Sequence, residues 1–161
     1  MAKTFASMVP SGWRPAEMAK PESWRLHGAS YPFSVAVPTR WADLDLLGHI
    51  NNVSMAGLFE EGRGRFNRAL DLHHGDKSIR WLIAAVDLNY LGEAHHPNDM
   101  VMASGIGRIG ERSWTILSAA FQNGQCVATC DTTLVYTDAN GPTAFPASFT
   151  PKFEAVRAVS R

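Results

Sequence analysis

The chain has 161 residues, of which 45% are hydrophobic and 19% are charged. This length and composition indicate one globular domain with a packed core and exclude a disordered chain. Lys plus Arg and Asp plus Glu both number 15, so no overall positive field favours nucleic acid or an anionic membrane as a partner. We therefore expect local groups to hold any anionic ligand.

The first part of the chain is rich in proline and has no sustained hydrophobic period. We predict an N-terminal arm over residues 1–31 and a domain over residues 32–161. Trp13 and Trp24 are isolated in the arm and could hold it against the body of the domain. There is no signal-peptide pattern and no run of about 18 apolar residues. We therefore expect a cytoplasmic protein with no membrane partner.

A strand followed by a helix is predicted next. Residues 33–37 alternate between large apolar and small or polar side chains, which is the two-residue period of a half-buried strand. Pro38 cannot donate to a ladder, so the strand ends there or lies where that donor is not needed. From Asn52 the apolar residues recur every three or four positions, which predicts an amphipathic helix. Gly62 lies in that apolar stripe and costs about 1 kcal/mol against alanine, so we interpret it as a point of close approach to a sheet.

Four more strands are predicted after a loop. The first, residues 79–91, is largely apolar, which suggests burial on both faces. The other three are joined by tight reversals, and they cover residues 100–109, 114–122 and 126–137. Asn123-Gly124 is a strong hairpin signal between the last two. A short helix is expected over residues 151–160.

The element order therefore predicts an α+β fold in which an antiparallel five-stranded sheet curls around one long helix. One face of that sheet would remain bare, which predicts self-association. Metal binding is not indicated. His73-His74 and His95-His96 lack helical i,i+4 spacing and the H-E-x-x-H signature, so we interpret them as loop histidines. The two cysteines lie four apart on one predicted strand, which suits neither a disulfide nor a zinc site.

The segment RWADLDLLGHINN directly precedes the predicted helix. Asp43 and Asp45 could project to one side of an extended chain, and Gly48 permits a turn. Asn51 or Asn52 is a good N-cap. The unpaired amides of a helix start suit an oxyanion, and a carboxylate just upstream can deliver itself or water to a carbonyl. Turn chemistry alone also explains each residue separately, because Asp and Asn cap helices and Gly makes turns.

RWADLDLLGHINN followed by FEEGR resembles the 4-hydroxybenzoyl-CoA thioesterase-like branch of the hotdog-fold superfamily. VDLNYLGEAHHPND and RIGERSWTILSAAFQNGQCVATCDTTLVYTD resemble later strands of that family in order and spacing. The resemblance covers about residues 32 to 146. It implies a hotdog fold and hydrolysis of an acyl-CoA thioester to a free acid and CoA, with no metal and no cofactor beyond the CoA of the substrate.

The resemblance also implies roles for single residues. Asp45 matches the catalytic carboxylate, which attacks the thioester carbonyl or activates water. Gly48 and the amides from His49 to Asn52 match the turn and helix start that polarise the thioester oxygen. Trp41 falls where relatives have a tyrosine that lines the site.

Other matches concern the ends of the substrate and the partner subunit. Met55 replaces the tyrosine usual in NNxxY, which changes the shape expected for the acyl pocket. Arg108 and Arg112 match a turn at which relatives place basic residues near the CoA phosphates, although exposed arginines need no ligand to explain them. The family's active site lies between two subunits, so we expect a homodimer or homotetramer.

Three alternatives remain open from the sequence. The acyl group could be carried on acyl carrier protein instead of CoA. A hotdog hydratase or dehydratase would act on enoyl or hydroxyacyl thioesters, but its Asp/His or Glu/His arrangement is not found. A non-catalytic acyl-CoA-binding subunit would have no use for Asp45.

Overall fold

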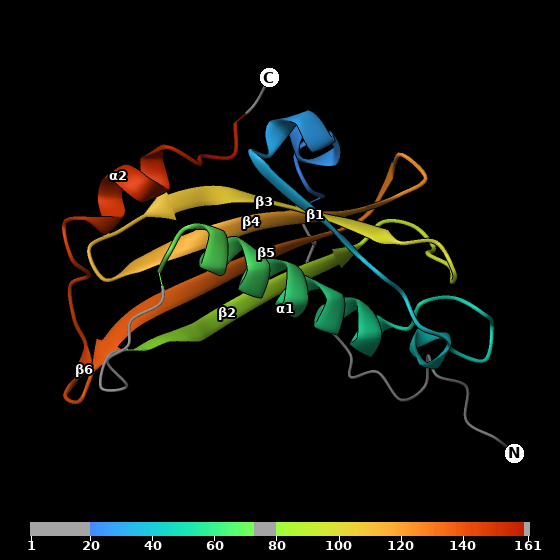
Figure 1. Ribbon diagram of the computed structural model, residues 1–161, viewed down its shortest axis with the longest axis horizontal. Helices are drawn as coiled ribbons and strands as arrows, with labels where there is room; N and C mark the ends of the chain where they lie inside the picture. Colours follow the sequence, from blue (N-terminus) through green and yellow to red (C-terminus); the bar gives the residue numbers. More distant parts are fainter. Residues whose placement is uncertain (1–19, 73–79, 160–161) are drawn as a thin grey trace, which may run out of the picture.

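The structure is a computed structural model that describes residues 20–72 and 80–159. Its long strands are β1 (Phe33–Val37), β2 (Arg80–Tyr90), β3 (Met100–Ile109), β4 (Ser113–Gln122) and β5 (Gln125–Asp138). Its helices are α1 (Asn52–Ala69) and α2 (Phe149–Glu154), and a two-residue strand β6 (Gly141–Pro142) pairs with β5. The sheet is antiparallel in the order β1-β3-β4-β5-β2, and it curls over α1 (Figure 1).

The predicted α+β hotdog fold is confirmed. Residues 33–37 and 100–109 form strands with the predicted boundaries. Strand β4 begins one residue earlier than predicted, and β5 is one residue longer than predicted at each end. The sixth strand was not predicted, because two residues carry no periodicity. Helix α2 begins two residues before the predicted start at 151 and ends at Glu154.

One half of the core lies between the first turns of α1 and the middle of the sheet. Met55, Leu58 and Phe59 of the helix pack with Met100 and Met102 of β3. A Cβ placed on Gly62 would lie 2.8 Å from the Cβ of Met102. The glycine therefore allows the close approach of helix and sheet that the sequence suggested.

The other half of the core closes the far end of the sheet. Phe66 of α1 joins Trp114 of β4 and the two phenylalanines of α2, Phe149 and Phe153. The rings of Trp114 and Phe153 have their centroids 5.0 Å apart. Helix α2 thus seals the end of the sheet opposite the N-terminus of α1 (Figure 1).

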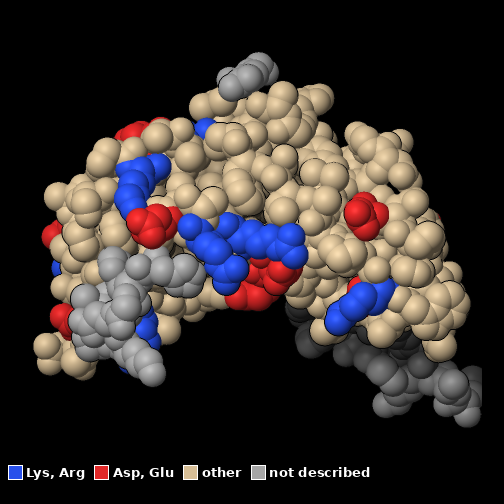
Figure 2. All heavy atoms as spheres, viewed as in Figure 1, with Lys and Arg blue, Asp and Glu red and all other residues tan. Residues whose placement is uncertain are grey.

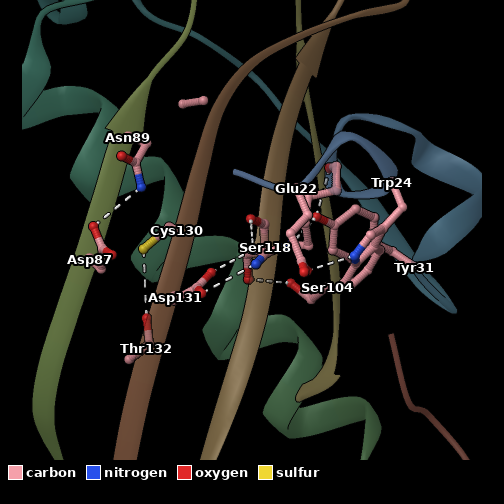
Figure 3. A network of polar contacts seen from close by, with 12 residues as sticks. Glu22, Trp24, Tyr31, Asp87, Asn89, Ser104, Ser118, Cys130, Asp131 and Thr132 are labelled. Carbon is pink, nitrogen blue, oxygen red and sulfur yellow. Dashed lines mark hydrogen bonds and ion pairs between the residues drawn. The ribbon is translucent and has the colours of Figure 1, made fainter. Parts of the chain in front are cut away.

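The segment at residues 20–31 covers part of the outer face of the sheet. Asp131 of β5 faces away from α1 and toward Tyr31 (Figure 3), and the buried guanidinium of Arg25 donates to both side chains. The ring of Tyr31 packs edge-on against Phe121 with centroids 6.5 Å apart. Trp24 instead donates to its neighbour Glu22. Arg25 and Tyr31 therefore anchor this segment more than Trp24 does, and Trp13 lies outside the described residues.

Strand β2 differs from its prediction. Within the described part of the chain it lies at the edge of the sheet and pairs with β5 alone, and most of its residues are exposed in the single chain. Leu82, Ile83 and Val86 remain 50%, 47% and 52% exposed. The expected burial on both faces is therefore wrong within one chain, because β2 lies at the edge of the sheet and leaves these apolar side chains exposed. Ile79, the first residue of that predicted run, is outside the described residues.

Among the described residues, no helix has both the length and the apolar character needed to cross a membrane.

Candidate active site

A small closed loop carries Asp45. Leu44 and Ile50 form an antiparallel bridge, and the amide of Asp45 donates to the carbonyl of His49 at 2.8 Å. Gly48 has a φ of 82°, which glycine adopts without steric cost. Its amide donates back to the carbonyl of Asp45 at 3.1 Å. The loop therefore holds Asp45 at a fixed position just before helix α1.

The carboxylate of Asp45 is exposed and held from one side. Its Oδ1 accepts hydrogen bonds from the amides of Leu47 at 2.8 Å and His49 at 3.1 Å. These amides, with His49 the larger contributor, hold the pKa of Asp45 below its ordinary value. No donor among the described residues reaches Oδ2. Asp45 is thus ionised near neutral pH, and its Oδ2 is unpaired among the described residues.

Asp43 has a different environment. Its side chain is buried, and it accepts bonds from the amide of Arg40 at 2.7 Å and from the guanidinium of the same residue at 2.8 Å. The hydrogen bond from the Arg40 side chain is the main reason that the pKa of Asp43 lies below its ordinary value. Its carbonyl oxygen accepts from both the amide and the Nδ2 of Asn51. Both carboxylate oxygens of Asp43 therefore already accept hydrogen bonds, and its carbonyl helps to close the loop.

Asn51 is the N-cap of α1. Its Oδ1 accepts a hydrogen bond from the amide of Ser54 at 2.9 Å. Its Nδ2 donates to the carbonyl of Asp43 and to the hydroxyl of Ser54. The side chain is thus committed to capping the helix. Between the two candidate N-caps that the sequence left open, the structure selects Asn51.

Of the amides expected to be free, that of Asn52 is unpaired among the described residues, and the neighbouring amide of Val53 is unpaired as well. The amides of residues 48–51 all have acceptors within the chain. The amides of Asn52 and Val53, at the first turn of α1, have none among the described residues, because a first turn lacks intrahelical acceptors. The helix start thus offers two unpaired donors and the positive end of its dipole. These two amides are the groups available to polarise a carbonyl oxygen.

Exposed apolar side chains surround this point. Trp41, Leu46, Leu47 and Val53 are all largely exposed. The hydroxyl of Tyr90 donates to the carbonyl of Asn52 at 3.1 Å, which ties the end of β2 to the start of α1. No sequence pattern points to Tyr90, because its contact depends on how β2 crosses the helix. The candidate site therefore lies beside the uncovered edge of the sheet.

A cavity of about 500 Å³ adjoins the helix start between α1 and β1. It is lined by Val37, Pro38, Arg40, Asp43, Val53, Ser54, Gly57, Leu58, Glu61 and Arg65. Glu61 and Arg65 form an ion pair at 2.8 Å, and charged side chains gather over the middle of α1 (Figure 2). Such a volume is within the range of small-molecule pockets.

Other residues singled out in the sequence lie elsewhere. Met55 is buried in the core under α1 and does not line the cavity. Arg108 and Arg112 are exposed at the β3–β4 turn, whereas the loop of Asp45 contacts Ala94, which precedes β3. The β3–β4 turn and the loop before α1 thus lie at opposite ends of the sheet in one chain (Figure 1). If they meet the same substrate, they must do so across two subunits.

The chain matches a known protein family. The sequence profile of the thioesterase-like superfamily matches residues 39–153. The chain belongs to this superfamily. No curated protein sequence matches the chain significantly.

Solved structures of the same fold include three from bacteria. The PA5185 protein of Pseudomonas aeruginosa is 22% identical with a TM-score of 0.75, over 84% of this chain and 98% of that one. A predicted thioesterase from Bacillus stearothermophilus is 26% identical with a TM-score of 0.71, over 78% and 96%. A thioesterase from Thermus thermophilus, complexed with coenzyme A and Zn, is 24% identical with a TM-score of 0.70, over 78% and 95%. The thioesterase-like family and these neighbours together make thioester hydrolysis the general activity class of the chain.

Proposed function

We propose that the protein hydrolyses an acyl-CoA thioester to a free acid and CoA. The main support is the pairing of an exposed, ionised carboxylate at Asp45 with a helix start whose Asn52 and Val53 amides are unpaired. The coenzyme A bound to the Thermus thermophilus relative favours CoA over acyl carrier protein as the carrier of the acyl group.

The chemistry follows from these two groups. The thioester oxygen accepts from the amides of Asn52 and Val53, which stabilise the negative charge that develops as the carbonyl carbon is attacked. Asp45 acts through its free oxygen in one of two ways. It attacks the carbonyl carbon and expels the CoA thiolate, leaving an anhydride that water hydrolyses, or it removes a proton from an attacking water. In the second route the tetrahedral intermediate collapses with loss of CoA, which takes the proton back from Asp45. Both routes need only the chain, the substrate and one water molecule.

The cavity beside the helix start is the proposed place for part of the substrate chain. Val53 belongs both to its lining and to the pair of unpaired amides, so a carbonyl at the helix start can extend a substituent into it. Trp41 borders the same region as an exposed aromatic surface. Its ring meets His96 edge-on with centroids 6.5 Å apart.

We further propose that two copies pair through β2, as a homodimer or as the building unit of a homotetramer. The strand has an unpaired edge and carries exposed Leu82, Ile83 and Val86, which an exposed edge strand of a stable monomer would normally avoid. Because Tyr90 joins this strand to the start of α1, a partner on β2 also reaches the exposed apolar rim of the site. Arg108 and Arg112 of a partner remain candidates for the CoA phosphates.

A thiol-release assay tests the activity. The purified protein is incubated with short, long and aromatic acyl-CoAs and with acyl carrier protein thioesters, and free thiol is measured. Hydrolysis of at least one acyl-CoA supports the proposal. Saturable binding without thiol release indicates a non-catalytic binding subunit, and loss of the enoyl absorbance of crotonyl-CoA without thiol release indicates a hydratase. Either result contradicts the proposed activity.

A further inference from the structure

We propose that His49, Glu93 and His95 form a binding site for a divalent transition metal such as Zn²⁺. One ligand atom of each side chain lies within 4.8 Å of the others. The Nε2 of His49 is 3.4 Å from Oε2 of Glu93, and the rings of the two histidines meet edge-on with centroids 5.1 Å apart. In the sequence, His49 lies far from His95-His96 and Glu93 shows no metal-ligand spacing with them, so the cluster becomes visible only in the fold.

The donor set selects the class of metal. Two imidazoles and one carboxylate are typical ligands of zinc and of neighbouring transition metals, whereas magnesium and calcium prefer oxygen alone. Ligand bonds of about 2.0–2.1 Å in a tetrahedral site place two ligand atoms about 3.3 Å apart. The His49 to Glu93 separation of 3.4 Å already matches that value. A modest rotation of His95 would complete a three-ligand site with a fourth position open to water.

The loops that carry the ligands are joined and held. The amide of Ile50 donates to the carbonyl of Ala94 at 2.8 Å, so the residue after His49 is fastened to the residue between the other two ligands. The backbone of His95 is held on both sides by the buried side chain of Gln122, which accepts from its amide and donates to its carbonyl, each at 2.8 Å. The ligand backbones are thus positioned before any metal binds, which lowers the ordering cost of binding.

A simpler account is an ion pair between protonated His49 and Glu93. That account uses two of the three side chains and gives His95 no role. It also predicts no saturable binding of metal. The two accounts therefore differ in what happens when a metal is added to the protein and when His95 alone is changed.

The test compares His95→Gln with His96→Gln as a matched control. His96 is the adjacent histidine, but its Nδ1 lies 3.2 Å from the hydroxyl of Thr39, outside the cluster. Glu93→Gln is a second variant, and its side chain is 68% exposed, so folding should tolerate the change. Each full-length protein is stripped with chelator and titrated with Zn²⁺ by calorimetry and with Co²⁺ by visible absorption. Melting temperature is recorded with and without metal.

The proposal predicts one tightly bound metal per chain in the wild type and in His96→Gln, with a higher melting temperature because the metal binds the folded state. Affinity should fall by about tenfold or more in His95→Gln and in Glu93→Gln, since even outer-shell changes cost that much. The Co²⁺ spectrum should lack a thiolate charge-transfer band. Equal affinity in the wild type and both cluster variants, or no saturable binding to the wild type, would overturn the proposal. These readouts do not depend on the proposed hydrolase activity.

Discussion

Asp45 and His49 are joined by two hydrogen bonds: the amide of Asp45 donates to the carbonyl of His49 at 2.8 Å, and the amide of His49 donates to the carboxylate Oδ1 of Asp45 at 3.1 Å. This reciprocal pair closes the loop and keeps the carboxylate charged. Because Oδ1 accepts hydrogen bonds from amides of the loop, we expect Oδ2 to be the oxygen that takes part in the proposed chemistry.

The pH dependence of hydrolysis should follow from that pairing. The folded pKa of Asp45 is lowered, so the reactive carboxylate persists as pH falls through the ordinary aspartate value of about 3.9. The acid limb of kcat/KM should therefore lie below that value, provided that tryptophan fluorescence shows the protein still folded at each pH. An acid limb between about pH 6 and 7 would instead indicate an essential histidine.

Gly62 should not tolerate a side chain. A methyl group there would meet the Cβ of Met102 at 2.8 Å, and that atom cannot move without its strand, so Gly62→Ala should lower the free energy of unfolding by about 1–2 kcal/mol. Gly64→Ala is the control, because an added Cβ there meets nothing within 4 Å. It should raise stability by up to about 1 kcal/mol through helix propensity. Urea unfolding measures both, and equal effects would contradict the packing argument.

The ion pair of Arg25 with Asp131 should stabilise the domain. Arg25 is 6% exposed, and Arg25→Ala leaves the carboxylate of Asp131 without its partner. The free energy of unfolding should fall by about 1–3 kcal/mol. This is less than for a fully buried pair, because the side chain of Asp131 is 38% exposed. Lys152→Ala breaks an exposed pair with Asp71 and should cost under about 1 kcal/mol. If thermal unfolding shows the two variants to be equal, the segment at residues 20–31 contributes little to the fold.

Pairing through β2 can be tested at Val86. Val86→Arg places a charge on the exposed edge strand and should convert the assembly to monomers, as measured by light scattering, with loss of thiol release. Val101→Arg is the control, since Val101 is also exposed, at 41%, but belongs to the interior strand β3. A Val86→Arg protein with the mass of the wild type would contradict pairing through this strand.

Much of the fold could be predicted because period and turn chemistry are local. The two-residue period of β1, the three-four spacing of α1 and the Asn123-Gly124 turn each specify structure within a short segment. The position of Gly62 within the apolar stripe likewise predicted the close approach of helix and sheet. The position of β2 at an edge could not be read in the same way, because an apolar strand looks alike whether its own domain or a partner covers it.

The site was harder to predict because its details depend on hydrogen bonds between segments that are separate in the sequence. The sequence indicated a helix start with open amides, but the bond from Asn51 to the carbonyl of Asp43 decides which amides remain free. Likewise, His49 meets Glu93 only because Ile50 is bonded to Ala94. No spacing in the sequence reports either contact.

The central claim is that the carboxylate of Asp45 performs the chemistry, and Asp45→Asn tests it most directly. An asparagine oxygen can still accept from the amides of Leu47 and His49, so the loop should keep its shape. Asp138→Asn is the matched control, since Oδ1 of Asp138 accepts from the amide two residues later at 2.7 Å, as Oδ1 of Asp45 does, but lies at the β5–β6 turn. With the best acyl-CoA substrate, kcat should fall by about 10²-fold or more in Asp45→Asn and remain unchanged in Asp138→Asn. Wild-type hydrolysis of every accepted thioester by folded Asp45→Asn would contradict the account.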